Sequence, residues 1–272
     1  MSKLATIRTS TGTRAVKLDG DQHIDLGFSD LREYFAAGSP APAADAPTYP
    51  VAGADFAPVT QPSKVVCVGH NYANHIKEMG RELPEYPVLF PKFAETLLGA
   101  NDDIVYPVET EALDWEVEIC VVIGKEVRRA TDEQAAEAIA GFTVMNDISV
   151  RDWQFRTIEW TQGKIWEATT PVGPYVVTPD EVGGVKPALE VKTVVNGEVM
   201  QNDNTGTLVF DPVFLVKYIS TMITLKPGDI IAGGTPAGVG QARDPKVFLK
   251  VGDKVVTSIE GLGECVNTIV EG

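Results

Sequence analysis

The hydrophobic pattern from residue 64 onward predicts short strands separated by glycine-rich turns. Three segments are typical of buried strands: 64–69, which is apolar after Lys64; 114–124, which alternates at first and is wholly apolar from Ile119; and 142–148. The Asn196-Gly197 pair lies between two alternating segments and is a strong hairpin signal. The chain has neither the regular strand–helix alternation of a doubly wound sheet nor a repeat of fixed period. We therefore predict a mainly β (α+β) fold.

Few segments have a helical pattern, and all of them are short. We predict helices at 29–37, 71–80, 131–141 and 211–223. Thr131 and Gln134 have the spacing of a capping box, and Asp211 before Pro212 is a helix-start signal.

The first 60 residues differ from the rest of the chain in their residue pattern. Short alternating segments cover residues 4–26, and a tract rich in proline and alanine follows at 38–62. We predict a small N-terminal β region with a strap at 1–60 and a catalytic domain at 61–272. His23 is expected on the surface of the N-terminal region.

Charge and composition exclude several classes of protein. The 272 residues contain 23 Lys and Arg against 38 Asp and Glu, a formal net charge of −15. Binding to nucleic acid or to an anionic membrane needs a basic face, so neither partner is expected. No apolar run reaches the about 18 residues of a membrane span, and no secretory signal is visible, so we expect a cytoplasmic protein. The cysteines Cys67, Cys120 and Cys265 are isolated within apolar runs and are expected to be buried thiols.

Three carboxylates lie on strands that the pattern predicts to be buried. Glu116 and Glu118 are two residues apart, so their side chains, and that of Asp114, share one face of a strand. Asp147 ends another apolar strand. Carboxylates without clustered His or Cys form an all-oxygen site, which favours Mg²⁺ or Mn²⁺. The alternative is a solvated edge face without function.

Candidate proton-transfer and cationic groups lie in other segments. His75 and Glu78 are three apart on a predicted helix, where a carboxylate can orient an imidazole as a general base. The alternative is an ordinary surface pair. Arg151, just after Asp147, could supply positive charge. The glycine-rich turn at 233–240 favours a tight turn that presents Thr235 to a cleft.

The ordered motifs of the chain resemble those of the fumarylacetoacetate hydrolase family. The resemblance covers about 64–267. Its segments include VGHNYANHIKEM, PVLFPKF, LDWEVEICVVIGK, GFTVMNDISVRDWQ, QGK and YISTMITLKPGDIIAGGTPAGVG. It implies a mixed β-sheet roll with a few short helices, and a homodimer.

The resemblance also implies roles for individual residues. Glu116, Glu118 and Asp147 would bind Mg²⁺ or Mn²⁺, and His75 with Glu78 would activate a water. Lys164 would polarise a substrate carbonyl. The positions that match substrate contacts of the family are Tyr72, Arg151, Gln154 and Thr235.

The implied activity is hydrolysis of a C–C bond in a 2,4-dioxo acid, such as an acylpyruvate of aromatic catabolism, with release of pyruvate. The alternatives are decarboxylation of oxaloacetate or a related oxo-diacid, isomerisation of a 2-hydroxydienoate, and a non-catalytic binding protein. One departure from the family is Ile165-Trp166-Glu167, where Ser-Phe-Asp usually follows the lysine. We expect this change to alter the wall of the substrate pocket.

Overall fold

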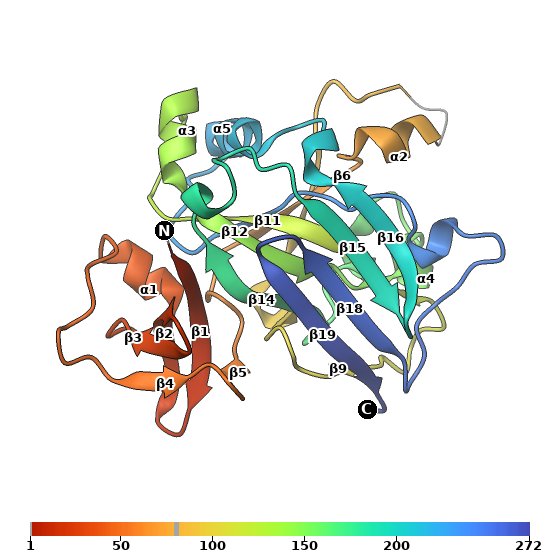
Figure 1. The fold of residues 1–272 in the computed structure, drawn as a ribbon. Helices are drawn as coiled ribbons and strands as arrows, with labels where there is room; N and C mark the ends of the chain where they lie inside the picture. Colours follow the sequence, from red (N-terminus) through yellow and green to blue (C-terminus); the bar gives the residue numbers. More distant parts are fainter. Residues whose placement is uncertain (1, 79–81) are drawn as a thin grey trace.

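The computed structural model describes residues 2–78 and 82–272 of the chain. Two sheets form the framework, and the smaller one lies across the larger (Figure 1). The larger sheet contains, in spatial order, β4 (Thr48–Pro50), β3 (Gln22–Asp25), β2 (Gly12–Asp19), β1 (Lys3–Thr9), β14 (Thr170–Val177), β12 (Ile139–Asn146), β11 (Val117–Ile123), β17 (Ile230–Ala232), β6 (Val65–Gly69) and β7 (Val88–Lys92), with β5 (Asp55–Phe56) beside β1 and β8 (Leu97–Leu98) beside β14.

The smaller sheet contains β16 (Glu198–Asn204), β15 (Glu190–Val195), β18 (Lys254–Ile259), β19 (Gly263–Val270) and β9 (Ile104–Val105). A separate two-stranded ladder joins β10 (Leu113–Asp114) to β13 (Ser149–Val150). Most neighbours are antiparallel, while β6 runs parallel to β17 and β8 parallel to β14, so the sheets are mixed. The mainly β prediction is confirmed.

The helices are short and lie around the sheets. The α-helices are α1 (Leu31–Ala36), α2 (Ala73–Glu78), α3 (Asp132–Ala138), α4 (Arg151–Gln154) and α5 (Pro212–Met222). The 3₁₀ turns are η1 (Ala94–Thr96), η2 (Trp160–Gly163), η3 (Pro179–Glu181), η4 (Thr205–Thr207) and η5 (Gly240–Ala242). Among the described residues, no helix combines the length and apolar character needed to cross a membrane.

Local capping signals place the helix starts as predicted. Thr131 and Gln134 form the reciprocal capping box of α3, and the Asp211 carboxylate accepts a hydrogen bond from the Phe214 N–H at 2.9 Å. The predicted helix at 131–141 is too long at its end. From Ile139 onward the chain pairs with β11 instead, because the backbone groups of Ile139 to Asn146 find partners in that sheet.

The N-terminal strands extend the larger sheet, since β1 pairs with β14. Arg8 of β1 also donates two hydrogen bonds to the Asp102 carboxylate, at 2.8 and 2.6 Å. The prediction that His23 lies on the surface is wrong: its side chain is buried beside Tyr175, with Nε2 3.0 Å from the phenol oxygen. The division of the chain at residue 60 stays a prediction.

Strand β11 separates two apolar cores. Val117, Ile119, Val121 and Ile123 face the core shared with the smaller sheet, α3 and α5. Cys120 and Val122 face the other core, which contains residues of β6 and α1. Glu118 has the parity of this second face, so the alternation of β11 directs its carboxylate away from the smaller sheet.

Candidate active site

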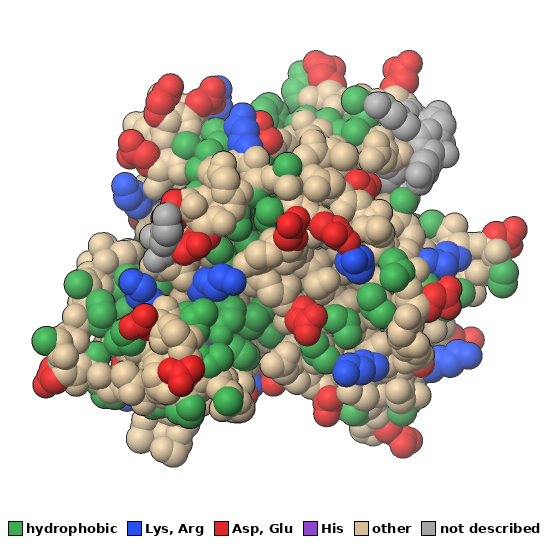
Figure 2. Space-filling view, in the orientation of Figure 1, with side chains coloured by type: hydrophobic (Ala, Val, Ile, Leu, Met, Phe, Trp, Pro, Cys, Tyr) green, Lys and Arg blue, Asp and Glu red, His purple; other side chains and the backbone are tan. Residues whose placement is uncertain are grey.

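Three carboxylates converge inside the protein. Acidic side chains on the face shown in Figure 2 are spread over the surface. By contrast, Glu116, Glu118 and Asp147 are buried, and each offers an oxygen that lies within 4.8 Å of the others. Glu116 lies just before β11, Glu118 within it, and Asp147 just after β12, its immediate neighbour. Sheet pairing therefore brings together the three acids that the sequence analysis predicts as metal ligands.

Glu118 is the acid of this cluster whose surroundings most favour a bound cation. Among the residues that the structure describes, no Lys or Arg forms an ion pair with it, and the Gly234 N–H donates to Oε2 at 2.9 Å. Burial, and then the charges of Asp147 and Glu116, raise the pKa of Glu118 well above its usual 4.5. A divalent ion would relieve both the repulsion and the desolvation, and hard oxygen ligands suit Mg²⁺ or Mn²⁺. The residues present thus fit a metal site, as predicted.

Two buried lysines neutralise the other carboxylates. Lys164 Nζ donates to Glu116 Oε2 and to Asp147 Oδ2, both at 2.8 Å, and lies 5.2 Å from the Phe90 ring centre. Lys92 Nζ donates to Asp147 Oδ1 at 2.7 Å and to the Lys164 carbonyl at 2.5 Å. Burial alone would raise the pKa of Asp147, but the two ammonium groups outweigh burial and hold it below its usual 3.8.

Lys164 is also held in its charged form. Burial disfavours the ammonium, but the charges of Asp147 and Glu116 outweigh it and raise the pKa of Lys164 above its usual 10.5. Two of its three N–H hydrogens point to carboxylates, which leaves one for a ligand. Lys92 has no role among the predicted site residues; its place at the end of the short strand β7 is the signal that could have indicated one.

Arg151 is buried behind the carboxylates. Its Nη2 lies 2.6 Å from Glu116 Oε1, its Nε donates to Asp114 Oδ2 at 2.8 Å, and its Nη1 donates to Gln154 Oε1 at 2.8 Å. The expectation that Asp114 shares the face of Glu116 and Glu118 needs correction, because Asp114 belongs to the separate strand β10. Its carboxylate accepts the Gly240 N–H at 2.7 Å, so it holds Arg151 and a loop rather than a metal.

A cavity of about 200 Å³ opens onto this cluster. Glu116, Glu118 and Lys164 lie on its charged side. Aromatic side chains, Phe90, Phe155 and Trp160, also line the cavity. Polar and charged groups also line the cavity: Arg151 and Gln154 from α4, Thr235 from the loop after β17, and His70 after β6.

The position of Lys164 depends on close packing by a glycine. Gly163 ends η2 directly before Lys164, and a Cβ there would lie 2.5 Å from the Gln154 Cβ and 2.6 Å from the Val150 carbonyl oxygen. Only glycine therefore lets η2 lie against α4. This contact delivers Lys164 and Gln154 to the same cavity.

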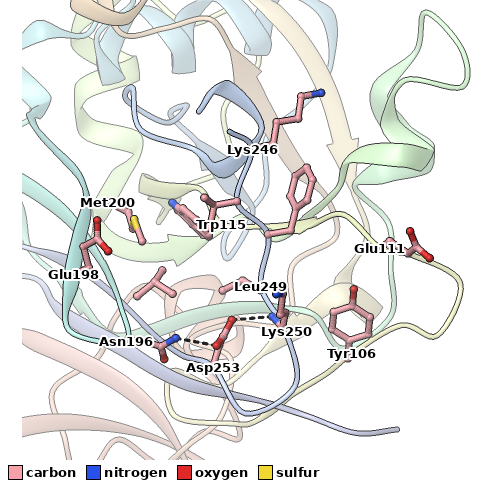
Figure 3. Close-up of a pocket in the computed structure, with 13 residues that line it drawn as sticks. Tyr106, Glu111, Trp115, Asn196, Glu198, Met200, Lys246, Leu249, Lys250 and Asp253 are labelled. Carbon is pink, nitrogen blue, oxygen red and sulfur yellow. Dashed lines mark hydrogen bonds between the residues drawn. The ribbon is translucent and has the colours of Figure 1, made fainter. Parts of the chain in front are cut away.

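A larger cavity, of about 650 Å³, lies elsewhere and is less suited to a small anion (Figure 3). Trp115 and Leu249 line its apolar part. Its acidic residues Glu111, Glu198 and Asp253 outnumber its two lysines. The smaller cavity, which contains the carboxylates together with Lys164 and Arg151, is the better candidate for chemistry.

The remaining predicted residues differ in how the structure places them. Tyr72 is entirely buried and does not line the cavity, and its hydroxyl has no hydrogen-bond partner among the described residues. Burial, and then the charge of Glu118, raise the pKa of Tyr72 above its usual 10. His75 and Glu78 lie on α2, but their side chains are outside what the structure describes. Their dyad stays a prediction.

The departure at 165–167 does not reach the cavity. Ile165, Trp166 and Glu167 are absent from its described lining. The Trp166 ring instead packs edge-on against Trp153, with ring centres 5.2 Å apart, and its indole N–H donates to the Gln162 carbonyl at 3.0 Å. The expectation that this change alters the pocket wall is therefore wrong for the lining that the structure describes, since Trp166 packs against Trp153 instead.

Comparisons with known proteins agree with this fold. A model of the fumarylacetoacetate hydrolase C-terminal domain matches residues 64–270. The chain is 45% identical over 231 residues to a mitochondrial oxaloacetate tautomerase, FAHD2A, of Homo sapiens, covering 84% of this chain and 73% of the relative.

Two solved structures resemble the whole chain. A fumarylacetoacetate hydrolase from Exiguobacterium antarcticum has a TM-score of 0.90 and 32% identity, covering 100% of both chains. A 5-carboxymethyl-2-hydroxymuconate delta-isomerase from Mycobacterium smegmatis has a TM-score of 0.85 and 31% identity, covering 99% of this chain and 100% of the other. The family match spans the carboxylates, the lysines and the cavity, and the chain belongs to the fumarylacetoacetate hydrolase family.

Proposed function

We propose that the protein is a metal-dependent isomerase that interconverts the keto and enol forms of a small 2-oxo dicarboxylic acid of the oxaloacetate type. In this reaction a proton leaves C3 and a proton is added at the 2-oxo oxygen, while every C–C bond is retained and no water is consumed. The observation that carries the proposal is the set of hydrogen-bond donors around the carboxylates. Lys164, Gln154 and Thr235 all line the cavity.

The donors match the oxygens of a 2-oxo acid. Gln154 Oε1 is already occupied by Arg151, so its amide N–H groups remain to contact a ligand. The charged Lys164 can stabilise the negative charge that develops on the 2-oxo oxygen when C3 loses its proton. A divalent ion held by Glu116, Glu118 and Asp147 would polarise the 2-oxo group and lower the cost of removing that proton.

The charge balance of the site favours an anionic substrate. Lys92, Lys164 and Arg151 are three buried cations beside four buried carboxylates, which are the predicted ligands and Asp114. A bound divalent ion would convert the one excess negative charge into one excess positive charge.

The choice of isomerisation is supported by the relatives. Several proteins that are 44–46% identical to the chain are named oxaloacetate tautomerases, and a solved structure of similar fold is named an isomerase. These names favour the isomerase alternative over the C–C hydrolase that the sequence analysis puts first. A cytoplasmic location and a homodimer stay predictions. The relatives themselves are named as mitochondrial proteins.

The test follows the enol of oxaloacetate by its ultraviolet absorbance, with Mg²⁺, with Mn²⁺ and with a chelator. Pyruvate is measured in the same samples with lactate dehydrogenase. We expect metal-dependent loss of enol without pyruvate. Pyruvate formed as fast as the enol disappears would show decarboxylation instead. Rapid cleavage of acetylpyruvate without tautomerisation of oxaloacetate would favour the C–C hydrolase.

Matched variants tie the activity to the cluster. Glu116→Gln should abolish the metal-dependent rate, whereas Glu264→Gln, an exposed glutamate of β19, should leave it unchanged. Exchange of the C3 proton in D₂O separates the candidate bases. We expect His75→Gln to slow this exchange by roughly 10²-fold or more. An equal loss in His70→Gln alone would move the role to His70, which lines the cavity.

A further inference from the structure

The direction of the Thr235 hydroxyl is set by a residue outside the cavity. We propose that Gln201 is a positioning residue that holds Thr235 as a hydrogen-bond donor toward the bound anion. The inference rests on the proposed function only where it names that anion as the carboxylate end of a 2-oxo acid.

The orientation of the amide follows from two backbone partners. Gln201 Oε1 accepts the Val117 N–H at 3.1 Å, and Nε2 donates to the Pro236 carbonyl at 2.9 Å. A backbone N–H can only donate and a carbonyl can only accept, so a rotated amide would set donor against donor and acceptor against acceptor. Gln201 is 1% exposed, and water cannot compensate for such a mismatch.

The second Nε2 hydrogen determines what Thr235 can do. It is donated to Thr235 Oγ1 at 2.8 Å. A hydroxyl has one hydrogen and two lone pairs, and this contact occupies a lone pair. The hydroxyl hydrogen of Thr235 must therefore find another acceptor. Because Thr235 lines the cavity together with Lys164 and Gln154, an anion bound there is the acceptor that the geometry supplies.

A β-bulge brings Gln201 to this position. Thr193 pairs with Gln201, while Val194 pairs with Val199, so Met200 is the extra residue of β16. Met200 packs near Trp115 on the cavity of Figure 3, and the next side chain, Gln201, is buried toward β11. Val117, which Gln201 holds, lies between two of the predicted metal ligands. One amide thus connects the smaller sheet, the carboxylate strand and the Thr235 loop.

The loop that carries Thr235 fits against the same bulge. Gly238 has φ +103°, and a Cβ there would lie 2.0 Å from the Met200 carbonyl oxygen. That oxygen accepts a hydrogen bond from Arg243 Nη2 at 2.9 Å. The close approach explains why this part of the loop needs glycine, and it keeps Thr235 within reach of Gln201.

The test uses oxalate, a small planar dianion that undergoes no reaction, titrated calorimetrically into the Mg²⁺-loaded protein. Gln201→Glu keeps the size of the side chain and its accepting contacts to Val117 and Thr193, but removes the donor to Thr235 Oγ1 and to the Pro236 carbonyl, and the double-mutant cycle below separates these two losses. The Thr235 hydrogen is then drawn away from the cavity. We expect the Kd of oxalate to rise about 10-fold or more, as for loss of a hydrogen bond to a charged group. The KM for oxaloacetate should rise with it, and kcat should change less.

A double-mutant cycle separates positioning from a structural role. Thr235→Val should weaken oxalate binding to a similar extent, and Gln201→Glu should add less than about 2-fold in that background. Thr193→Val is the milder second variant, since it removes one hydrogen bond to Oε1 at 2.8 Å, and its smaller effect should also vanish with Thr235→Val. Val199→Thr, on the exposed side of β16, is the control and should bind as the wild type does.

Two results would overturn the proposal. One is an equal loss from Gln201→Glu with and without the Thr235 hydroxyl; the other is wild-type protein that does not bind oxalate. The proposed function fails differently, namely when the wild type binds oxalate but does not tautomerise oxaloacetate. In that case the cycle with oxalate still decides the role of Gln201.

Discussion

The ammonium of Lys92 and the carboxylate of Asp147 lie 2.7 Å apart, and both side chains are entirely buried. The two residues are 55 positions apart in the chain. Lys92 does not line the cavity, and its other hydrogen bonds go to the Lys164 and Ile148 carbonyls. It therefore holds Asp147 and the Lys164 backbone in place, while Lys164 itself faces the ligand.

Removing Lys92 should destabilise the protein strongly. Lys92→Met leaves Asp147 with one cationic partner fewer in a dry environment, and breaking a buried pair costs about 3–5 kcal/mol. The free energy of unfolding in urea measures this loss. The control is Lys125→Met, which removes an exposed pair with Glu137 at 3.8 Å and should have little effect. Equal effects of the two variants would contradict the assignment.

Glu118→Gln should stabilise the metal-free protein and remove its response to metal. Glutamine keeps an acceptor for the Gly234 N–H but carries no charge, so the repulsion from Asp147 and Glu116 disappears. We expect Tm in chelator to rise by a few degrees. In the wild type, Mg²⁺ at about 100 times its Kd should add about 2.7 kcal/mol of stability, and the variant should lack this gain. A full metal response in the variant would remove Glu118 from the site.

The stability of the protein should fall in mild acid because of His23. Burial lowers the pKa of His23 below its usual 6.5, so the unfolded chain binds a proton more readily than the folded one. The contribution of His23 to the free energy of unfolding is fully present above the usual pKa of 6.5, and it is lost as the pH falls from there toward the lowered pKa of the folded state. Between neutral pH and about pH 5.5, Tm should fall less in His23→Phe than in the wild type. Tyr175→Phe removes the partner but keeps the imidazole, and should retain the pH dependence.

Trp166 should affect stability and not catalysis. Trp166→Phe weakens the edge-on contact with Trp153 and loses the hydrogen bond to Gln162, so Tm should fall slightly. The KM for oxaloacetate should stay within about 2-fold of the wild type, since single surface changes have small effects. Trp160→Phe is the comparison within the cavity and should change KM. A larger KM effect from Trp166 would show that 165–167 reach the substrate after all.

Local patterns predicted those parts of the fold that depend on neighbours in the chain. Alternation predicts that Val117 and Ile119 lie on the apolar face of β11 and that Glu116 and Glu118 point to the opposite face, because successive strand residues point to opposite faces. The capping box at Thr131 follows from hydrogen bonds within one helical turn. The end of that helix was wrong because β11 competes for Ile139.

Such local patterns do not predict contacts between segments that are far apart in the chain. Alternation predicts that Asp114 shares the face of Glu116 and Glu118, but Asp114 belongs to the separate strand β10 and its carboxylate accepts a hydrogen bond from Arg151. The sequence predicts an exposed His23, but β1 pairs with β14 in the larger sheet, and Tyr175 of β14 lies beside the buried imidazole. Each error concerns a residue whose environment is made by another part of the chain.

By itself the sequence determined the mainly β class, the starts of α3 and α5 and the acids of the candidate metal site, since these follow from backbone periodicity and the chemistry of carboxylates. Only the tertiary structure decided that Lys92 supports Asp147 and that Gln201 orients Thr235 across separations of 55 and 34 residues. The physical reason is that a buried polar group must find its partner wherever the fold places one, and no local spacing encodes that position.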